Sequence, residues 1–364
     1  MHSTVHQTET LLFGVLLQVV VMIAAARLGN QLLRKLGQPG VIGEIVAGLL
    51  LGPSLFGRLF PAASHFVFGT STAAPIGVIS QIGLVLLMFQ IGAEFEFSHL
   101  ADARSRHATL AIAVASIGVP SALGLAIGLV SARSLAPQTD RLTYALFLAV
   151  GFAITAVPIL GRILREFDLT QRRIGVVAIA AAALNDVTGW VMLAAISAYA
   201  SARLSLARIG LQIGGIVLLG ALAWFVLRPL VRRLLELWPI EDGEVPANLM
   251  AVVVCLIFSV GLCTSELGIF TIFGGFLAGL LFHTDRRFVA AWRSQVGNFV
   301  LVLFLPVFFT YTGLRTDLLG LRGAGDWGWL ALVLVAAIVG KLAPVYLAGR
   351  AFGFSRREGA ILGV

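Results

Sequence analysis

The sequence predicts an all-α polytopic membrane protein built as an inverted repeat, with about 12–13 transmembrane helices of which the last are truncated. Hydrophobic residues make up 59% of its 364 residues, charged residues only 12%, and the mean hydropathy is +0.96. Ordinary soluble domains carry about 25% charged residues. The apolar residues form runs long enough to cross a hydrocarbon core of about 30 Å, and two pairs of these runs resemble each other.

Eleven apolar runs, each bounded by charged or Pro- and Gly-rich loops, predict full transmembrane helices. A twelfth run begins near Glu358 and stops at Val364, so we expect a truncated chain that lacks its last helices. Several runs are short and rich in glycine, which suits close helix packing or broken helices. The predicted spans cover residues 11–28, 41–56, 76–91, 108–130, 144–164, 175–198, 209–227, 247–264, 269–282, 296–314 and 329–348.

Basic residues predict the orientation of these spans. Eighteen of the 26 Lys and Arg residues fall in alternate loops, beginning with the loop after the first span, and seven fall in the loops between them. Since positively charged loops stay in the cytoplasm, we expect the N-terminus outside. We expect the protein to be an integral protein of a bacterial inner membrane. The net charge of +8 is carried by short loops between spans, which argues against a nucleic-acid partner.

Two consecutive spans recur later in the chain. Residues 43–50 (GEIVAGLL) resemble residues 274–281 (GGFLAGLL), and residues 84–89 (LVLLMF) resemble residues 301–306 (LVLFLP). The shift is seven spans, an odd number, so the second copy has the opposite orientation. This is the inverted-topology repeat of many secondary transporters. The alternative is chance similarity between apolar runs.

Asp186 follows Asn185 near the middle of the sixth span. An ionised Asp at mid-depth costs roughly 2.5–3.5 kcal/mol even on the mild insertion scale, which an inert anchor does not need. We interpret Asp186 as a carboxylate that meets a proton or a cation. Competition between the two for one carboxylate would couple their movements. The alternative is a structural Asp paired with a basic residue.

The fifth span contains Ile154, Thr155 and Pro158. Proline removes a backbone donor and clashes with the preceding turn, which frees carbonyls near Ile154 and Thr155. Bare backbone at membrane depth requires cover by protein or a wet cavity. Freed carbonyls and the Thr155 hydroxyl are oxygen ligands suited to Na⁺ or K⁺. The alternative is an ordinary proline kink.

Two further charges merit attention. Lys341 is the only basic residue deep in a span, and it is either a counter-charge to Asp186, a second proton carrier, or a side chain that snorkels to the interface. Glu44 lies near the inner end of the second span, where it either lines a cytoplasmic entrance or is a simple interface residue. No His falls deep in a span, so we expect a monovalent cation rather than a transition metal. We expect neither a cofactor nor an enzymatic reaction.

The motifs together resemble those of the monovalent cation:proton antiporter family, which includes sodium/hydrogen exchangers and Kef-type potassium proteins. The resemblance is carried in order by residues 41–53, Thr155 with Pro158, Asn185-Asp186, residues 273–279, residues 304–309 and Gly340-Lys341. It implies one transmembrane exchanger domain over residues 1–364, with thirteen helices in the whole protein. Core helices would cover about 76–198 and 296–364, and dimerisation or scaffold helices about 11–56 and 209–282.

The resemblance also implies roles for single residues. The family's cation-binding acid falls on Asp186, its hydroxyl ligand on Thr155 and its conserved basic residue on Lys341. Asn185 before the acid is typical of electroneutral members. Some of those members carry a Glu where this chain has Ala181, which leaves the stoichiometry open.

We therefore expect a homodimeric antiporter that exchanges Na⁺ or K⁺ for protons. Alternating access would involve two crossing, discontinuous helices, one in the fifth span and one beginning at Glu358. A gated potassium efflux channel or another ion-coupled solute carrier of the same fold is the alternative. A regulatory domain beyond Val364 is also expected as a partner of the transport domain.

Overall fold

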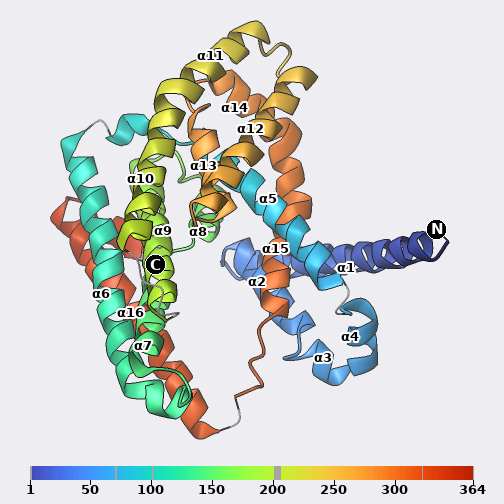
Figure 1. The fold of residues 1–364 in the computed structure, drawn as a ribbon, viewed down its shortest axis with the longest axis vertical. Helices are drawn as coiled ribbons and strands as arrows, with labels where there is room; N and C mark the ends of the chain where they lie inside the picture. Colours follow the sequence, from blue (N-terminus) through green and yellow to red (C-terminus); the bar gives the residue numbers. More distant parts are fainter. Residues whose placement is uncertain (1, 70–71, 101, 201–205, 322, 364) are drawn as a thin grey trace. The chain divides into compact units, whose positions relative to one another are not determined.

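The computed structural model describes residues 2–69, 72–100, 102–200, 206–321 and 323–363 (Figure 1). Within these ranges the regular structure is helical, apart from one isolated β-bridge between Glu241 and Glu244. The chain divides into two compact units. Unit 1 comprises Met1–Ala93, Val231–Val260 and Ile272–Arg322, and unit 2 comprises Glu94–Leu230, Gly261–Thr271 and Gly323–Val364. Val364, where the sequence stops, lies outside the described residues.

All eleven predicted spans fall on helices. Nine helices of the described part are long and apolar enough to cross a membrane, and a bent pair makes a tenth. The predicted ninth span is the shorter apolar helix Thr271–Leu280. The all-α membrane fold is therefore confirmed. In chain order the helices are α1 (His2–Lys35), α2 (Gly40–Leu51), α3 (Phe56–Leu59), α4 (Pro61–Val67), α5 (Ala73–Ala93), η2 (Phe97–Leu100), α6 (Ala103–Leu135), α7 (Arg141–Ala153), α8 (Val157–Glu166), α9 (Arg173–Ala200), α10 (Leu206–Leu222), η3 (Ala223–Leu227), α11 (Arg228–Leu237), α12 (Ala247–Glu266), α13 (Thr271–Leu280), α14 (Arg286–Trp292), η4 (Arg293–Gly297), η5 (Val300–Phe304), α15 (Leu305–Leu314), α16 (Ala324–Ala351) and α17 (Arg356–Gly363).

The predicted tenth span, residues 296–314, lies mostly in the second part of a bent helix pair. The two parts of this pair, Arg286–Gly297 and Val300–Leu314, meet at 42°. The π-helical segments η4 and η5 flank the bend, and Pro306 stands in the first turn of α15. Each π-helical turn inserts an extra residue, so the regular hydrogen-bond ladder changes on both sides of the bend. The apolar run predicts the span but not the bend.

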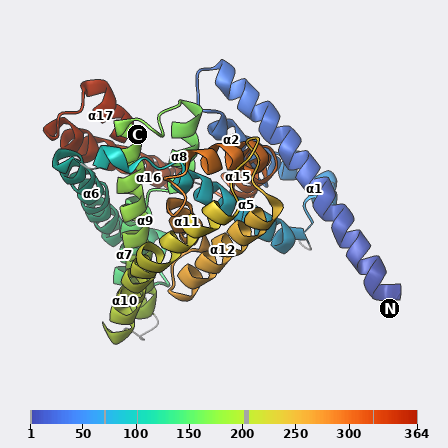
Figure 2. The same ribbon diagram turned by 90° about the horizontal axis from the view of Figure 1, so that it is seen from above.

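In unit 1, the two copies of the repeat pack against each other through glycine. A Cβ at Gly48 of α2 would overlap the backbone of Thr310 in α15, and a Cβ at Gly279 of α13 would overlap the carbonyl of Phe89 in α5. The second span of one copy thus packs on the third span of the other, in both directions. Helices α5 and α15 also lie side by side (Figures 1 and 2). This reciprocal packing, in which each copy contacts the other, agrees with the inverted repeat predicted from the sequence.

Unit 2 is a bundle formed mainly by α6, α7, α9 and α16 (Figures 1 and 2). Small residues allow these helices to approach closely, as where Gly128 of α6 lies against Ala145 of α7. A buried apolar cluster that includes Ile112, Val177 and Val345 joins α6, α9 and α16. The bundle surrounds the interruption between α7 and α8.

We predict that Gly48→Ala destabilises the protein. The added methyl group would force α2 and α15 apart, and overpacking of this kind costs roughly 1–3 kcal/mol. The melting temperature of the purified protein in detergent should fall. Gly220→Ala in α10 is the control, because a Cβ there meets no atom within 4 Å. Equal melting temperatures for the two variants would contradict the close α2–α15 contact.

Candidate cation-binding site

The predicted fifth span is broken. Helix α7 ends at Ala153, α8 begins at Val157, and the residues between them are not helical. Ile154 has φ −60° and ψ 133°, an extended conformation. Pro158 stands in the first turn of α8, where its missing amide costs nothing. A helix continuing from α7 would place its ring against the carbonyl of Ile154. The discontinuous helix predicted from Pro158 is therefore present.

The two helix ends at this break meet opposite charges. Lys341 of α16 donates from Nζ to the carbonyl oxygens of Ala153 and Ile154, both at 3.0 Å. The amide of Val157, at the start of α8, donates to the carboxylate of Asp186. A helix carries about half a negative charge at its C-terminus and half a positive charge at its N-terminus. The ammonium and the carboxylate thus each lie at the helix end that favours them.

Asn185 holds the extended residue between the half-helices. Its Oδ1 accepts from the amide of Thr155 at 3.3 Å, and its Nδ2 donates to Thr155 Oγ1 at 3.2 Å. The same Nδ2 donates to Ser116 Oγ of α6 at 3.0 Å. Asn185 is fully buried, so these bonds satisfy a polar group that has no access to water. Asn185 thereby fixes the position of Thr155 relative to α6 and α9.

Ser116 is a residue of this site that sequence reasoning missed. It is 6% exposed, and its Oγ donates to the carbonyl of Ala113 at 2.9 Å, which leaves a lone pair for Asn185. Pro120 lies four residues further along α6 and lacks the amide that would bond the Ser116 carbonyl. A serine four residues before a mid-span proline was the signal that could have found it.

Gly189 is a second missed residue. It is buried on α9, and a Cβ there would lie 2.6 Å from Cγ1 of Ile154. Only a glycine lets the Ile154 side chain pack against this turn of α9. Since Ile154 also offers a carbonyl oxygen at the break, Gly189 helps to set where that oxygen lies.

The described residues of unit 2 therefore gather most of the predicted site. Asp186 is 8% exposed and attracts the charge of Lys341. Oxygen atoms of three kinds surround the break: the Asp186 carboxylate, the Thr155 hydroxyl, and the carbonyls of Ala153 and Ile154. Hard oxygen ligands of this kind suit an alkali cation. Lys341 holds the two carbonyls in this structure, rather than bonding Asp186 directly.

Two other positions discussed from the sequence lie elsewhere. Glu44 belongs to unit 1, where it is fully buried in α2 and its Oε1 accepts from Asn30 Nδ2 at 2.8 Å. Its place at a cytoplasmic entrance stays a prediction. Ala181 is 3% exposed and packs in the apolar cluster with Ile112, Val177 and Val345. The surroundings of position 181 are thus apolar.

Comparison with known proteins gives a consistent result. The family model described as "Sodium/hydrogen exchanger, transmembrane" matches residues 19–364. Cation/H(+) antiporter 18 of Arabidopsis thaliana is 34% identical over 353 residues, which cover 96% of this chain and 42% of the plant protein. Na(+)/H(+) antiporter NhaS4 of Synechocystis is 32% identical over 363 residues, which cover 98% of this chain and 86% of that protein. The chain thus spans less than half the length of the plant relative.

The fold also matches a solved structure. The sodium proton antiporter MjNhaP1 of Methanocaldococcus jannaschii superimposes with a TM-score of 0.62 and 17% sequence identity, over 97% of this chain and 82% of that one. At this identity the match concerns the fold alone. It agrees with the all-α membrane architecture predicted from the sequence.

We predict that Ser116→Ala lowers the melting temperature of the protein in detergent. The substitution leaves an amide hydrogen of Asn185 without an acceptor in a buried site, which costs about 1–3 kcal/mol. Ser134→Ala is a matched control on the same helix. Ser134 makes the same kind of bond, to the carbonyl of Ser131, but it is exposed. If both variants melt like the wild type, the Ser116–Asn185 bond does not support the site.

Proposed function

The chain belongs to the sodium/hydrogen exchanger family, and on that premise we propose that it is a secondary active antiporter that exchanges Na⁺ or K⁺ for protons by alternating access. The observation that carries this proposal is the broken span of α7 and α8, whose two ends meet Lys341 and Asp186. The relatives named as antiporters support exchange over a channel or another solute carrier.

The cation ligands in this proposal are Asp186, Thr155 Oγ1 and the carbonyl of Ile154, with Asn185 beside them. Asn185 donates to one lone pair of the Thr155 hydroxyl, which leaves the other lone pair for an ion. Asp186 is almost buried, so its negative charge favours a bound cation or a bound proton over the bare carboxylate. One carboxylate that holds either species in turn exchanges them.

Lys341 has a defined part in this cycle. Its ammonium donates to the carbonyls of Ala153 and Ile154, so it stands where a cation would take the Ile154 oxygen. Binding of Na⁺ or K⁺ then requires Lys341 to release that oxygen. When the cation leaves, the ammonium returns and again compensates the C-terminal end of α7. Lys341 thus keeps the break satisfied while Asp186 carries a proton.

We further propose an electroneutral exchange of one proton for one cation. Asn185 is neutral and engaged in hydrogen bonds, which leaves Asp186 as the acid of the Asn-Asp pair. Position 181, one helical turn before the Asn-Asp pair, is an alanine in an apolar cluster, so it adds no second acid. If Lys341 stays protonated throughout, only Asp186 exchanges a proton.

The remaining parts of the proposal concern the whole protein. We propose a homodimer with core helices near 76–198 and 296–364 and scaffold helices near 11–56 and 209–282. The arginine-rich loops support an N-terminus outside a bacterial inner membrane. Since this chain spans 42% of the plant relative, a regulatory domain beyond Val364 is part of the same proposal. Glu44 is proposed to act at the cytoplasmic side of the second span.

We predict that Asp186→Asn abolishes exchange. In proteoliposomes with a pH-sensitive dye inside, an outward gradient of Na⁺ or of K⁺ should acidify the lumen with the wild type. The variant should give no signal, because an amide binds neither a proton nor a cation strongly. The gradient, Na⁺ or K⁺, that acidifies the lumen identifies the transported cation.

Asp140→Asn is the control for the loss of a carboxylate. Asp140 caps α7 by accepting from the amide of Thr143 at 2.8 Å, and Asn caps helices about as well. This variant should exchange like the wild type. With the wild type, a potential-sensitive dye should show no change in signal if one proton is exchanged for one cation. Proton uptake by Asp186→Asn at the wild-type rate would refute the proposed role of Asp186.

We predict that Lys341→Gln changes the response of stability to cations. Without Na⁺ or K⁺ the variant should melt below the wild type, because two carbonyls lose bonds to a charged donor, each worth about 1.5–3 kcal/mol. Added Na⁺ or K⁺ should then raise its melting temperature more than that of the wild type, since no ammonium competes. Choline chloride at equal ionic strength is the salt control.

Lys341→Arg is the matched variant, because it keeps the positive charge and donates through several N–H groups. Its cation-dependent shift should stay close to that of the wild type. A shift of equal size in all three proteins would mean that Lys341 and the cation do not compete for the break.

A further inference from the structure

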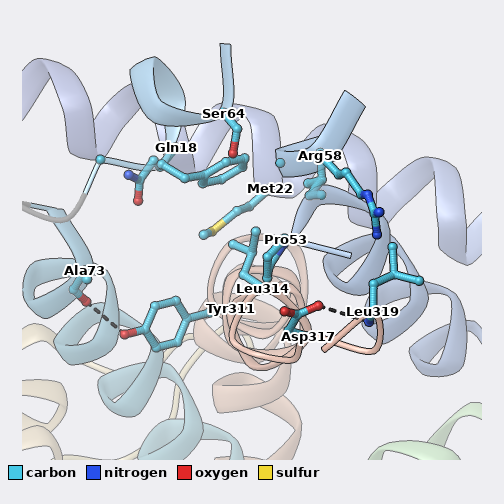
Figure 3. Close-up of a pocket in the computed structure, with 15 residues that line it drawn as sticks. Gln18, Met22, Pro53, Arg58, Ser64, Ala73, Tyr311, Leu314, Asp317 and Leu319 are labelled. Carbon is cyan, nitrogen blue, oxygen red and sulfur yellow. Dashed lines mark hydrogen bonds between the residues drawn. The ribbon is translucent and has the colours of Figure 1, made fainter. Parts of the chain in front are cut away.

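Unit 1 contains a cavity that the proposed exchange does not use. It has a volume of about 410 Å³ and lies among α1, α2, the α3–α4 segment and the end of α15 (Figure 3). Sites for small molecules span roughly 300–1,000 Å³, so the cavity has the size of a ligand site. Its wall mixes apolar and polar groups, with Met22, Pro53 and Leu314 toward the centre.

Two opposite charges line this cavity from different segments. Arg58 comes from α3, and Asp317 comes from the segment that follows α15. Figure 3 shows both side chains at the side of the cavity where Leu319 lies. Among the described residues they form no ion pair of 4 Å or less with each other or with another charge. Asp317 Oδ1 accepts from the amide of Leu319 at 3.0 Å, so Oδ2 is the oxygen that remains for a ligand.

The other polar side chains of the cavity are mostly engaged by the wall. Tyr311 donates from its hydroxyl to the carbonyl of Ala73 at 3.0 Å, and Gln18 donates from Nε2 to Thr72 Oγ1. These bonds connect α1 and α15 to the start of α5 and fix the cavity walls. Recognition of a ligand therefore falls mainly on Arg58 and Asp317. A group that carries both an anion and a cation offers a partner to each of these two side chains.

The apolar surface beside the cavity indicates where such a group comes from. Leu59 and Phe60, next to Arg58, are 61% and 59% exposed, and Phe66 of α4 is 68% exposed. Exposed apolar residues on a membrane protein face lipid chains. A ligand with a polar head in the cavity and hydrocarbon beside it matches this surface.

We propose that the cavity binds the headgroup of a phosphatidylethanolamine lipid, with the phosphate on Arg58 and the ammonium on Asp317. A guanidinium matches the geometry of a phosphate through paired N–H donors. The primary ammonium supplies N–H groups to the Asp317 carboxylate, which a quaternary choline lacks. A glycerol headgroup has no cation and leaves Asp317 without a partner. With the N-terminus outside, the site faces the outer leaflet.

The test uses the full chain purified in detergent, with lipid binding measured by native mass spectrometry. The probes are phosphatidylethanolamine, phosphatidylcholine and phosphatidylglycerol with identical dioleoyl chains. We expect phosphatidylethanolamine to bind about three- to tenfold more tightly than the other two. Arg58→Gln should weaken both ethanolamine and choline lipids, because they share the phosphate. Asp317→Asn should remove the preference for ethanolamine and leave choline-lipid binding unchanged.

The choline lipid is the internal control for correct folding of Asp317→Asn. Arg133→Gln, an exposed arginine near the end of α6 in unit 2, should change none of these affinities. No preference for ethanolamine in the wild type, or a preference that survives Asp317→Asn, would overturn the proposal. Soluble phosphoethanolamine that binds as tightly as the lipid would also overturn it, because the site would then serve a soluble zwitterion.

Discussion

Within a bilayer every backbone N–H and C=O needs a partner from the protein, and this chain interrupts a helix at Ile154, Thr155 and Ala156. The architecture of unit 2 follows from that constraint. α16 supplies Lys341 to the carbonyls at the end of α7, and α9 supplies Asn185 to the backbone of Thr155. Asp186 accepts from the start of α8. Without these three side chains the break would leave bare dipoles in hydrocarbon.

Unit 1 depends on a different constraint, the close approach of helix backbones. In water the hydrophobic effect drives helices together, but lipid tails are as apolar as Leu, so helices in a membrane gain mainly from close contact. Gly48 and Gly279 provide such contacts at the corresponding position of each repeat. The same sequence motif therefore makes this contact in both copies. In each case the partner helix belongs to the other copy. The aromatic cluster of Phe89, Phe282 and Trp292 fills the space beside one of these contacts.

The sequence predicted the spans, the break and the acid because each has a local signal: apolar length, a proline and a lone charge. It did not predict the partners. Lys341 was interpreted as a counter-charge to Asp186, a second proton carrier or a snorkelling side chain, and none of these interpretations named the carbonyls of Ala153 and Ile154, to which its ammonium donates. Ser116 and Gly189 act through contacts between helices, and a single sequence does not encode which helices are neighbours. The 42° bend between Gly297 and Val300 was missed for a related reason, since an apolar run has no period that marks a π-helical turn.

The contact between Lys341 and the two carbonyls has a consequence for how strongly a cation is held. The ammonium is attached to α16, so its effective concentration at the break is fixed by the length of its side chain and by the position of that helix. A free cation competes against this tethered charge as well as against water. The affinity of the proposed site for a cation then depends on the difference in free energy between the site with the cation bound and the site with the Lys341 ammonium in place. Changes along α16, for example beside Gly340 or Pro344, would adjust it without altering any ligand of the ion.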